Sequence, residues 1–187
     1  MKRYAVLLVV ALLATVPAAA STFVGLTHDE LVEQSHSVVI ARVVQQSSAW
    51  SDDGRVIWTD NILAIEETII GKAAGHVTVR TAGGQVGDYV VEASGFPKFE
   101  SNEHVLLFLH HDAKAGATRV LGFQQGHFSI VERLDGVVLA VPMVEDGATL
   151  MGKNGHHLAA PTSLPLEQFK QQIRATAARL DSNRIEK

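Results

Sequence analysis

The sequence predicts a mainly β protein, either an antiparallel barrel or a sandwich of about seven or eight strands. Short runs rich in β-branched residues recur along the chain, with glycine, aspartate or proline turn signals between them. Helical apolar spacing occurs near the two ends of the predicted domain, so we expect a short N-terminal helix and an amphipathic C-terminal helix. The regular alternation of strands and helices that marks a nucleotide-binding sheet is missing.

The first twenty residues have the pattern of a secretory signal peptide. A basic start precedes the apolar run 5–16, and small residues fill positions 18–20. The alternative is an uncleaved membrane anchor, but the run is shorter than the roughly 20 residues that a spanning helix needs. We therefore expect cleavage after Ala20 and a periplasmic or secreted location. Residues 21–187 are predicted to form a single β-rich domain without a membrane span.

The composition of this domain excludes several function classes. Without Lys2 and Arg3 the 16 basic residues become 14 against 20 acidic ones, so the net charge is −6 rather than −4. This balance is too acidic for a protein held on nucleic acid by its phosphates. The chain has no cysteine, which excludes a thiol nucleophile, a redox pair, a lipid-modified N-terminal cysteine and cysteine-based zinc sites.

The domain is predicted to open with a helix and a β-hairpin. Thr27 followed by Glu30 is a capping box, so we expect a helix over residues 28–35. Residues 37–47 are apolar on both alternating faces and predict a strand covered on both sides. The stretch 51–55 combines aspartates with a glycine and predicts the hairpin turn.

The remaining strands are predicted from the same alternation. Residues 103–111 form the most apolar run after the leader, so this strand is expected to be central. A pattern shift at Asp60-Asn61 predicts a bulge or bend. Leu134-Asp135-Gly136 predicts a hairpin turn. The predicted strands are 56–70, 76–81, 88–93, 103–111, 119–123, 127–132 and 137–141.

The C-terminal part of the chain is predicted to contain a loop and a helix. Residues 142–163 have scattered glycines among polar residues and predict a long surface excursion. Leu166, Phe169 and Ile173 begin an apolar stripe at helical spacing, which predicts a helix over 165–181 that packs against the strands.

An ordered series of motifs runs through residues 26–131. It consists of Val38-Val39-Ile40-Ala41-Arg42-Val43, a turn at Trp50, Ile70-Gly71-Lys72, Gly83-Gly84-x-Val86-Gly87, Gly95-Phe96-Pro97-Lys98-Phe99, Glu103-x-Val105-Leu106-Leu107-Phe108-Leu109 and Gly122-Phe123-Gln124-Gln125-Gly126-x-Phe128. In this order the motifs resemble an uncharacterised family of exported bacterial β-barrel proteins. The resemblance implies a fold and a compartment, and it carries no activity and no functional residues.

More distantly, the first half resembles the OB-type barrel of netrin-like modules and tissue inhibitors of metalloproteases. This resemblance implies an OB-like barrel and, as an alternative function, a metalloprotease-inhibitor-like role. In those inhibitors an N-terminal cysteine presents its amine and carbonyl to the zinc of the protease. Here cleavage would leave Ser21-Thr22-Phe23, so an inhibitory role predicts that these residues project as a wedge.

The sequence contains no motif for catalysis or metal binding. The histidine pairs 110–111 and 156–157 are chain neighbours, which point to opposite faces of a strand. Ser94 lacks the Gly-x-Ser-x-Gly elbow. The glycines of 83–87 lack the Lys-Ser/Thr of a phosphate loop, and a bend is the expected role. We expect no metal site, no cofactor and no catalytic residue.

Aromatic side chains are the candidates for binding. Trp50 and Trp58 flank the predicted hairpin, and Phe96 and Phe99 flank Pro97; cross-strand packing is the alternative role. The sequence favours a non-catalytic binding or interaction module with an unknown protein or carbohydrate partner in the cell envelope or exterior. The alternatives are the inhibitor-like protein and an enzyme of unrecognised type.

Overall fold

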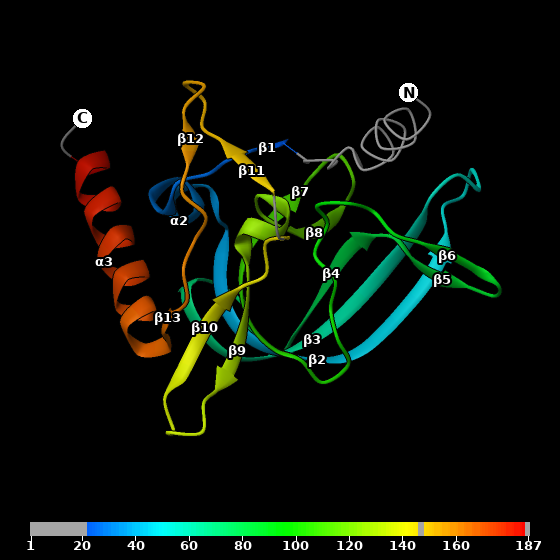
Figure 1. Cartoon of the computed structure of the whole chain (residues 1–187), viewed down its shortest axis with the longest axis horizontal. Helices are drawn as coiled ribbons and strands as arrows, with labels where there is room; N and C mark the ends of the chain where they lie inside the picture. Colours follow the sequence, from blue (N-terminus) through cyan, green and yellow to red (C-terminus); the bar gives the residue numbers. More distant parts are fainter. Residues whose placement is uncertain (1–21, 146–147, 186–187) are drawn as a thin grey trace, which may run out of the picture.

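The computed structural model describes residues 22–145 and 148–185, so the predicted signal peptide lies outside the described residues. A large sheet of eight strands dominates the molecule (Figure 1). Its strands, in spatial order, are β13 (Leu164–Pro165), β10 (Val138–Pro142), β9 (His127–Glu132), β7 (His104–Asp112), β2 (Ser37–Trp50), β3 (Ile57–Gly71), β4 (His76–Ala82) and β8 (Ala117–Val120). The mainly β fold is confirmed.

Five strands of this sheet close on themselves into a partial ring. β8 pairs antiparallel with β7 and parallel with β4, so the order β7-β2-β3-β4-β8 returns to β7. The contact between β4 and β8 is a single pair, Val79 with Thr118. The sheet is therefore mixed, with one parallel contact in a sheet that is otherwise antiparallel, as the prediction of a mainly antiparallel arrangement allows.

Two smaller sheets complete the β structure. β1 (Thr22–Val24) pairs parallel with β11 (Thr149–Met151), which pairs with β12 (His157–Leu158). β5 (Gly84–Val86) and β6 (Tyr89–Val91) form a hairpin beside the outer ends of β2 and β3 (Figure 1). The predicted excursion over 142–163 is thus partly wrong, because β11 and β12 pair with each other and β11 also pairs with β1, more than 100 residues earlier in the chain.

Two helices lie on one side of the sheet. α2 (His28–Gln34) begins at Thr27, whose hydroxyl accepts from the Glu30 amide while the Glu30 carboxylate accepts from the Thr27 amide, so the capping box is confirmed. α3 (Leu166–Ile185) is the expected C-terminal helix. It starts one residue late because Pro165 pairs with β10. Neither helix of the described residues is long and apolar enough to cross a membrane.

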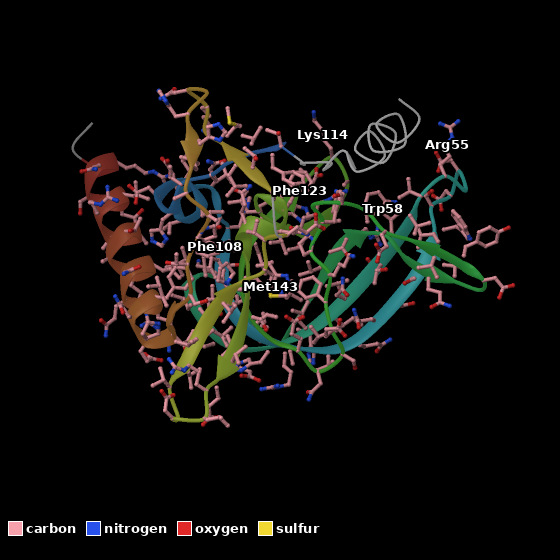
Figure 2. All side chains as sticks on the ribbon, viewed as in Figure 1. Arg55, Trp58, Phe108, Lys114, Phe123 and Met143 are labelled. Atoms are coloured by element: carbon pink, nitrogen blue, oxygen red, sulfur yellow. The ribbon has the colours of Figure 1, made fainter. Side chains whose placement is uncertain are left out.

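The interior is divided into two apolar clusters by the sheet. One cluster joins the sheet to α2 and α3 and includes Phe108, Phe128, Phe169 and Ile173. The other fills the ring and includes Val39, Val43, Leu63, Val79, Leu107 and Leu109. Figure 2 shows Phe108 on the side of α3 and Trp58 on the side of β5 and β6. β7 contributes to both clusters, and residues 105–109 are at most 1% exposed, which confirms it as a central strand.

Two local predictions are corrected by the register. The bulge does not lie at Asp60-Asn61, because the nearest break in pairing is on the partner strand, where Val43 pairs with Leu63 and Gln45 pairs with Ile62. Val44 is the extra residue. The predicted strand 119–123 also ends early, since β8 stops at Val120 and a 3-10 turn begins at Phe123.

Candidate functional site

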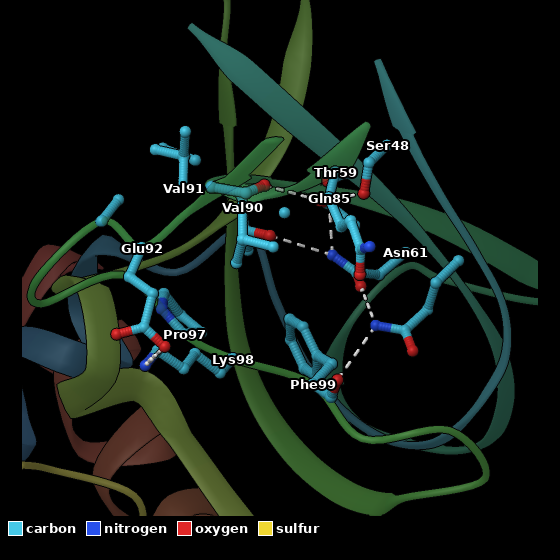
Figure 3. A pocket seen from close by; sticks show the side chains of 16 residues that line it. Ser48, Thr59, Asn61, Gln85, Val90, Val91, Glu92, Pro97, Lys98 and Phe99 are labelled. Atoms are coloured by element: carbon cyan, nitrogen blue, oxygen red, sulfur yellow. Dashed lines mark hydrogen bonds and ion pairs between the residues drawn. The ribbon is translucent and has the colours of Figure 1, made fainter. Parts of the chain in front are cut away.

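A cavity of about 350 Å³ opens at the end of the ring that lies beside β5 and β6 (Figure 3). We call it the cleft. β2, β3 and β4 form its floor, β6 forms one wall, and the segment before β7 forms the other. Its lining residues are Gln46, Ser48, Thr59, Asn61, Thr81, Ala82, Gly83, Gly84, Gln85, Val90, Val91, Glu92, Ala93, Pro97, Lys98 and Phe99.

The bulge at Val44 decides which side chains of β2 face the cleft. Before it, the odd-numbered residues Val39 and Val43 face the ring interior. After it, Gln46 pairs with Asn61 and Ser48 pairs with Thr59, so the even-numbered residues face inward. Directly opposed residues of an antiparallel pair lie on the same face, and one extra residue exchanges the two faces. The cleft therefore receives Gln46 and Ser48 instead of Gln45 and Ser47.

Asn61 is the centre of a hydrogen-bonded network on the floor. Its side chain is 1% exposed. Its Nδ2 donates to the Val79 carbonyl at 3.0 Å and to Thr81 Oγ1 at 3.1 Å, while its Oδ1 accepts from Gln46 Nε2 at 2.8 Å. Gln46 Nε2 also donates to the Phe99 carbonyl at 3.0 Å. These hydrogen bonds connect β2, β3 and β4 with one another and with Phe99 on the opposite wall.

A second group of hydroxyls lies farther out along the floor. Thr59 Oγ1 donates to the Gly83 carbonyl at 2.6 Å and lies 2.8 Å from Ser48 Oγ. Gly84 packs directly over this pair, with φ +135°, and a Cβ there would collide with Thr59 Oγ1 and Ser48 Oγ. A glycine is required at this position by its left-handed backbone and by the close approach. The glycines were predicted to form a bend or a bulge, and Gly83 and Gly84 both have positive φ where the chain passes from β4 to β5.

The floor of the cleft is polar but uncharged. Its side chains carry amides and hydroxyls, and the charged residues among the lining set are Glu92 and Lys98 at the rim. These two pair with each other at 3.0 Å, with side chains 74% and 59% exposed. Proton transfer requires a group that titrates near the working pH, and amides and hydroxyls do not. The floor is therefore suited to hydrogen bonding rather than acid–base chemistry.

An exposed apolar rim adjoins the cleft. Trp50 lies on the same face of β2 as Ser48 and is 39% exposed. Its ring meets Tyr89 edge to face, with centroids 5.7 Å apart. Tyr89 and Val90 are each 66% exposed. Large apolar side chains with this exposure at the mouth of a cavity are typical of a binding surface.

The four aromatic residues singled out from the sequence divide between two places. Phe99 forms part of the wall of the cleft, and Trp50 lies on the apolar rim that adjoins it. Trp58 pairs with Ala49 and so lies on the opposite face of the hairpin from Trp50. There it lies beneath the guanidinium of Arg119, 5.0 Å from the ring centroid. Phe96 contacts Phe123, with centroids 5.0 Å apart.

Phe99 is held in place by a buried histidine. His127 is fully buried, stacks against Phe99 with centroids 4.7 Å apart, and has Nε2 3.4 Å from Glu103 Oε1. Burial alone would raise the pKa of Glu103, but the nearby His127 ring and the hydrogen bond from the Glu100 amide outweigh it and hold this pKa below its usual value. This pair is enclosed and supports the wall of the cleft.

Two further observations concern metal binding and Ser94 in the described residues. These residues include no group of three or more His, Asp or Glu side chains that could hold a metal ion. Ser94 lies exposed in a turn, where its Oγ donates to Glu145 Oε2 at 3.4 Å.

The start of the described chain lies within a sheet. Thr22 pairs with Thr149, and Phe23 pairs with Leu150. Phe23 also packs against Gly95, where a Cβ would collide with its ring. Thr22 and Phe23 therefore do not project as the inhibitor-like role predicts, and Ser21 lies outside the described residues.

The polar floor of the cleft was not predicted from the sequence. Thr59 and Asn61 alternate with outward residues between Ile57 and Leu63, which are both fully buried. Polar residues at alternating positions inside an otherwise apolar strand face were the available signal. For Gln46 there was no such signal, because its orientation depends on the bulge at Val44.

No protein-family model, curated protein or solved structure matches the chain. The resemblances to exported bacterial barrels and to netrin-like modules therefore stay predictions, and the function has to be argued from the site itself.

Proposed function

We propose that this protein is an exported, non-catalytic binding module whose cleft takes an uncharged carbohydrate of the cell envelope or exterior. The observation that carries the proposal is the neutral floor of amides and hydroxyls inside an apolar ring. Buried polar groups cost stability relative to apolar ones unless every hydrogen bond is made. A set of them at the base of an open cavity is thus better explained by a ligand than by packing.

The hydrogen-bonding capacity left at the floor suits sugar hydroxyls. Gln46 uses both N–H groups on Asn61 and Phe99, which leaves its Oε1 to accept a hydrogen bond. The Gln85 amide adds a group that both donates and accepts, while Ser48 Oγ, which donates its own proton to Thr59, can still accept. A hydroxyl likewise donates and accepts, so each can be paired without burying a charge.

The apolar parts of the cleft complement the carbon–hydrogen faces of a sugar ring. Val90, Val91 and Phe99 line the walls, and Trp50 and Tyr89 extend the apolar surface beyond the mouth. Small-molecule sites combine apolar and aromatic walls with a few polar groups that fix orientation. A volume of about 350 Å³ is at the lower end of the usual range for such sites.

A protein partner is the competing ligand class and fits this floor less well. Extended peptides bind by adding a strand to a free edge. β3, which forms the centre of the floor, is paired with β2 on one side and β4 on the other. Recognition at the floor must therefore use side chains, and these present no charge or deep apolar socket for a peptide anchor.

We also propose that the five-strand ring is a small OB-like barrel, open where β4 and β8 share one residue pair. Both helices then cover the face of β2 and β7 that is turned away from the ring. The proposed export depends on the signal-peptide pattern of residues 1–20. The inhibitor-like alternative is less favoured because Thr22 and Phe23 are paired in a sheet.

Calorimetric titration of the purified chain tests the proposal. The probes are chitotriose, maltotriose and cellotriose, with trigalacturonic acid as the charged comparison. We expect saturable binding of at least one neutral trisaccharide and a loss of about tenfold in affinity in Gln46→Ala. Gln45→Ala is the matched control, since Gln45 is the exposed neighbour on the opposite face, and its affinity should be unchanged.

Two results would overturn the proposal. One is the absence of saturable binding for all three neutral probes. The other is an equal effect of Gln46→Ala and Gln45→Ala, which would place the binding surface outside the cleft. Tight binding of an uncharged extended peptide, competing with no sugar, would replace the carbohydrate by a protein partner.

A further inference from the structure

A second hollow lies on the other side of the segment that carries Phe96 and Phe99. It has a volume of about 230 Å³ and is lined by Arg80, Thr81, Phe96, Pro97, His110, Asp112, Arg119, Val120, Gly122 and Phe123. We call it the Arg119 pocket. Thr81 and Pro97 line both this pocket and the cleft, so the two sites share a wall but have different chemistry.

Arg119 is positioned in this pocket with unfilled hydrogen-bonding capacity. Its guanidinium lies over the ring of Trp58. Within the described residues its Nε is buried and has no hydrogen-bond acceptor. The nearest carboxylate oxygen, Asp112 Oδ2, is 3.5 Å away, beyond a good charge-assisted hydrogen bond. A buried donor without an acceptor is costly, and a ligand oxygen would remove that cost.

The neighbouring charges leave Arg119 as the group available to an anion. Arg80 is held by Asp60 through two hydrogen bonds of 2.6 and 2.7 Å. Asp112 Oδ1 accepts from the amides of Lys114 and Ala115, which fixes this carboxylate in its own loop. One guanidinium with a carboxylate nearby favours a monoanion over a dianion such as phosphate. The planar donor edge of arginine matches a carboxylate.

The opposite side of the pocket is aromatic. Phe96 and Phe123 meet edge to face at an interplanar angle of 89°. Phe123 is 47% exposed and has φ +59°, a left-handed conformation that non-glycine residues rarely adopt. Backbone strain at an exposed aromatic residue is a frequent sign of a ligand contact. The 5.0 Å between their centroids lies within the range of favourable aromatic pairs. A third aromatic ring at a similar distance would pack favourably against them.

We propose that the Arg119 pocket binds a small aromatic monocarboxylate, with the carboxylate on the guanidinium and the ring against Phe96 and Phe123. Benzoate is the simplest such ligand and serves as the probe. The proposal is independent of sugar binding in the cleft, because none of these three residues lines the cleft.

His110 supplies a reporter inside the pocket. Its Nδ1 is buried and lacks a partner among the described residues. Burial lowers the pKa of His110, opposed by Asp112 and reinforced by His36, Arg119 and His111. A carboxylate bound beside it adds negative charge, so the pKa of His110 should rise when benzoate saturates the pocket.

An NMR titration of the isotope-labelled chain tests the proposal. Benzoate should shift the Arg119 Nε–H, the Trp58 indole N–H and the His110 ring signals in a saturable way. Arg119→Gln should weaken binding at least about tenfold. Arg55→Gln is the control, since the Arg55 side chain is 82% exposed and outside the pocket. Benzyl alcohol, which has the ring without the charge, should bind more weakly than benzoate.

A second variant keeps the test decisive if Arg119→Gln fails to fold. Phe123→Gly removes the exposed ring and suits the left-handed backbone, so the chain should stay folded. It should weaken benzoate and leave the weaker binding of acetate unchanged. The proposal is overturned if benzoate causes no saturable shifts, if benzyl alcohol binds as tightly, or if the pKa of His110 is unchanged at saturation.

Discussion

The cleft and the Arg119 pocket lie on opposite sides of residues 96–99 and use polar groups in opposite ways. In the cleft, Asn61 and Gln46 bond to each other and to main-chain carbonyls, so most donors of the floor are already paired within the protein and only groups such as Gln46 Oε1 are left for a ligand. In the Arg119 pocket, the buried nitrogens of Arg119 and His110 have no acceptor within the described residues.

This difference separates a contribution to stability from a contribution to binding. A satisfied polar network stabilises the strands that it joins, and a ligand can use only the capacity left over. An unpartnered donor stabilises nothing by itself and gains a hydrogen bond only when a ligand arrives. Truncating a side chain of the network in the cleft should therefore lower the stability of the fold. Truncating Arg119 should mainly lower the affinity for benzoate.

The largest expected effect is on the network. Asn61→Ala removes a buried side chain that bonds Gln46, Thr81 and the Val79 carbonyl, and it leaves the buried Thr81 hydroxyl without this partner, so we expect a loss of about 2–3 kcal/mol in the free energy of unfolding. Urea denaturation followed by circular dichroism measures this loss. Asn154→Ala, in an exposed loop, is the control and should change stability by less than about 0.5 kcal/mol. Equal losses in the two variants would contradict the structural role of the network.

A smaller effect is expected in the Arg119 pocket. Arg119→Gln loses the contact with Trp58, worth about 0.5–1 kcal/mol, but also removes a buried donor without an acceptor. The net change in stability should be less than about 1 kcal/mol. The same urea denaturation measures this change. A loss in the free energy of unfolding as large as that of Asn61→Ala would show that Arg119 mainly stabilises the fold. The contrast between the two sites would then be wrong.

The smallest expected effect on stability concerns the ion pair between Asp60 and Arg80, beside this pocket, and it depends on pH. Hydrogen bonds from Arg80 hold the pKa of Asp60 below its usual value. A carboxyl with a lowered folded-state pKa stabilises the protein above its unfolded pKa of about 4, and this stabilisation is lost as the pH falls through the folded value. Because both side chains are more than a third exposed, we expect about 0.5 kcal/mol.

The experiment compares Asp60→Asn with the parent chain at pH 7 and pH 3. The variant should be less stable at pH 7, and the difference should be smaller at pH 3. Asp52→Asn, in the hairpin turn, controls for the loss of one negative charge. A difference as large at pH 3 as at pH 7 would assign the effect to packing rather than to the ion pair.

Local signals in the sequence predicted much of the fold. The capping box at Thr27, the central strand around Phe108 and the stripe on the C-terminal helix depend on neighbouring residues, and all three are confirmed. The pairing of β1 with β11 and the closure by β8 join segments far apart in the chain. No local pattern of apolar residues specifies such contacts.

The candidate site was predicted only in part, for a related reason. Aromatic residues stand out in a sequence, so Trp50 and Phe99 were noticed, whereas the glutamine and asparagine of the floor look like surface residues. The orientation of the glutamine, Gln46, follows from the bulge at Val44, since a shift of one residue exchanges the faces of a strand. The same alternation places Trp58 with Arg119 instead of beside Trp50.

The central claim is that a neutral ligand binds in the cleft on the even-numbered face of β2. The most direct test is an NMR titration with the best neutral trisaccharide, in which the side-chain amide signals of Gln46 and Gln45 are followed together. Binding in the cleft predicts saturable shifts for the Gln46 amide, with the Gln45 amide unchanged. Shifts in Gln45 alone, or no shift in either amide at saturation, would contradict the account.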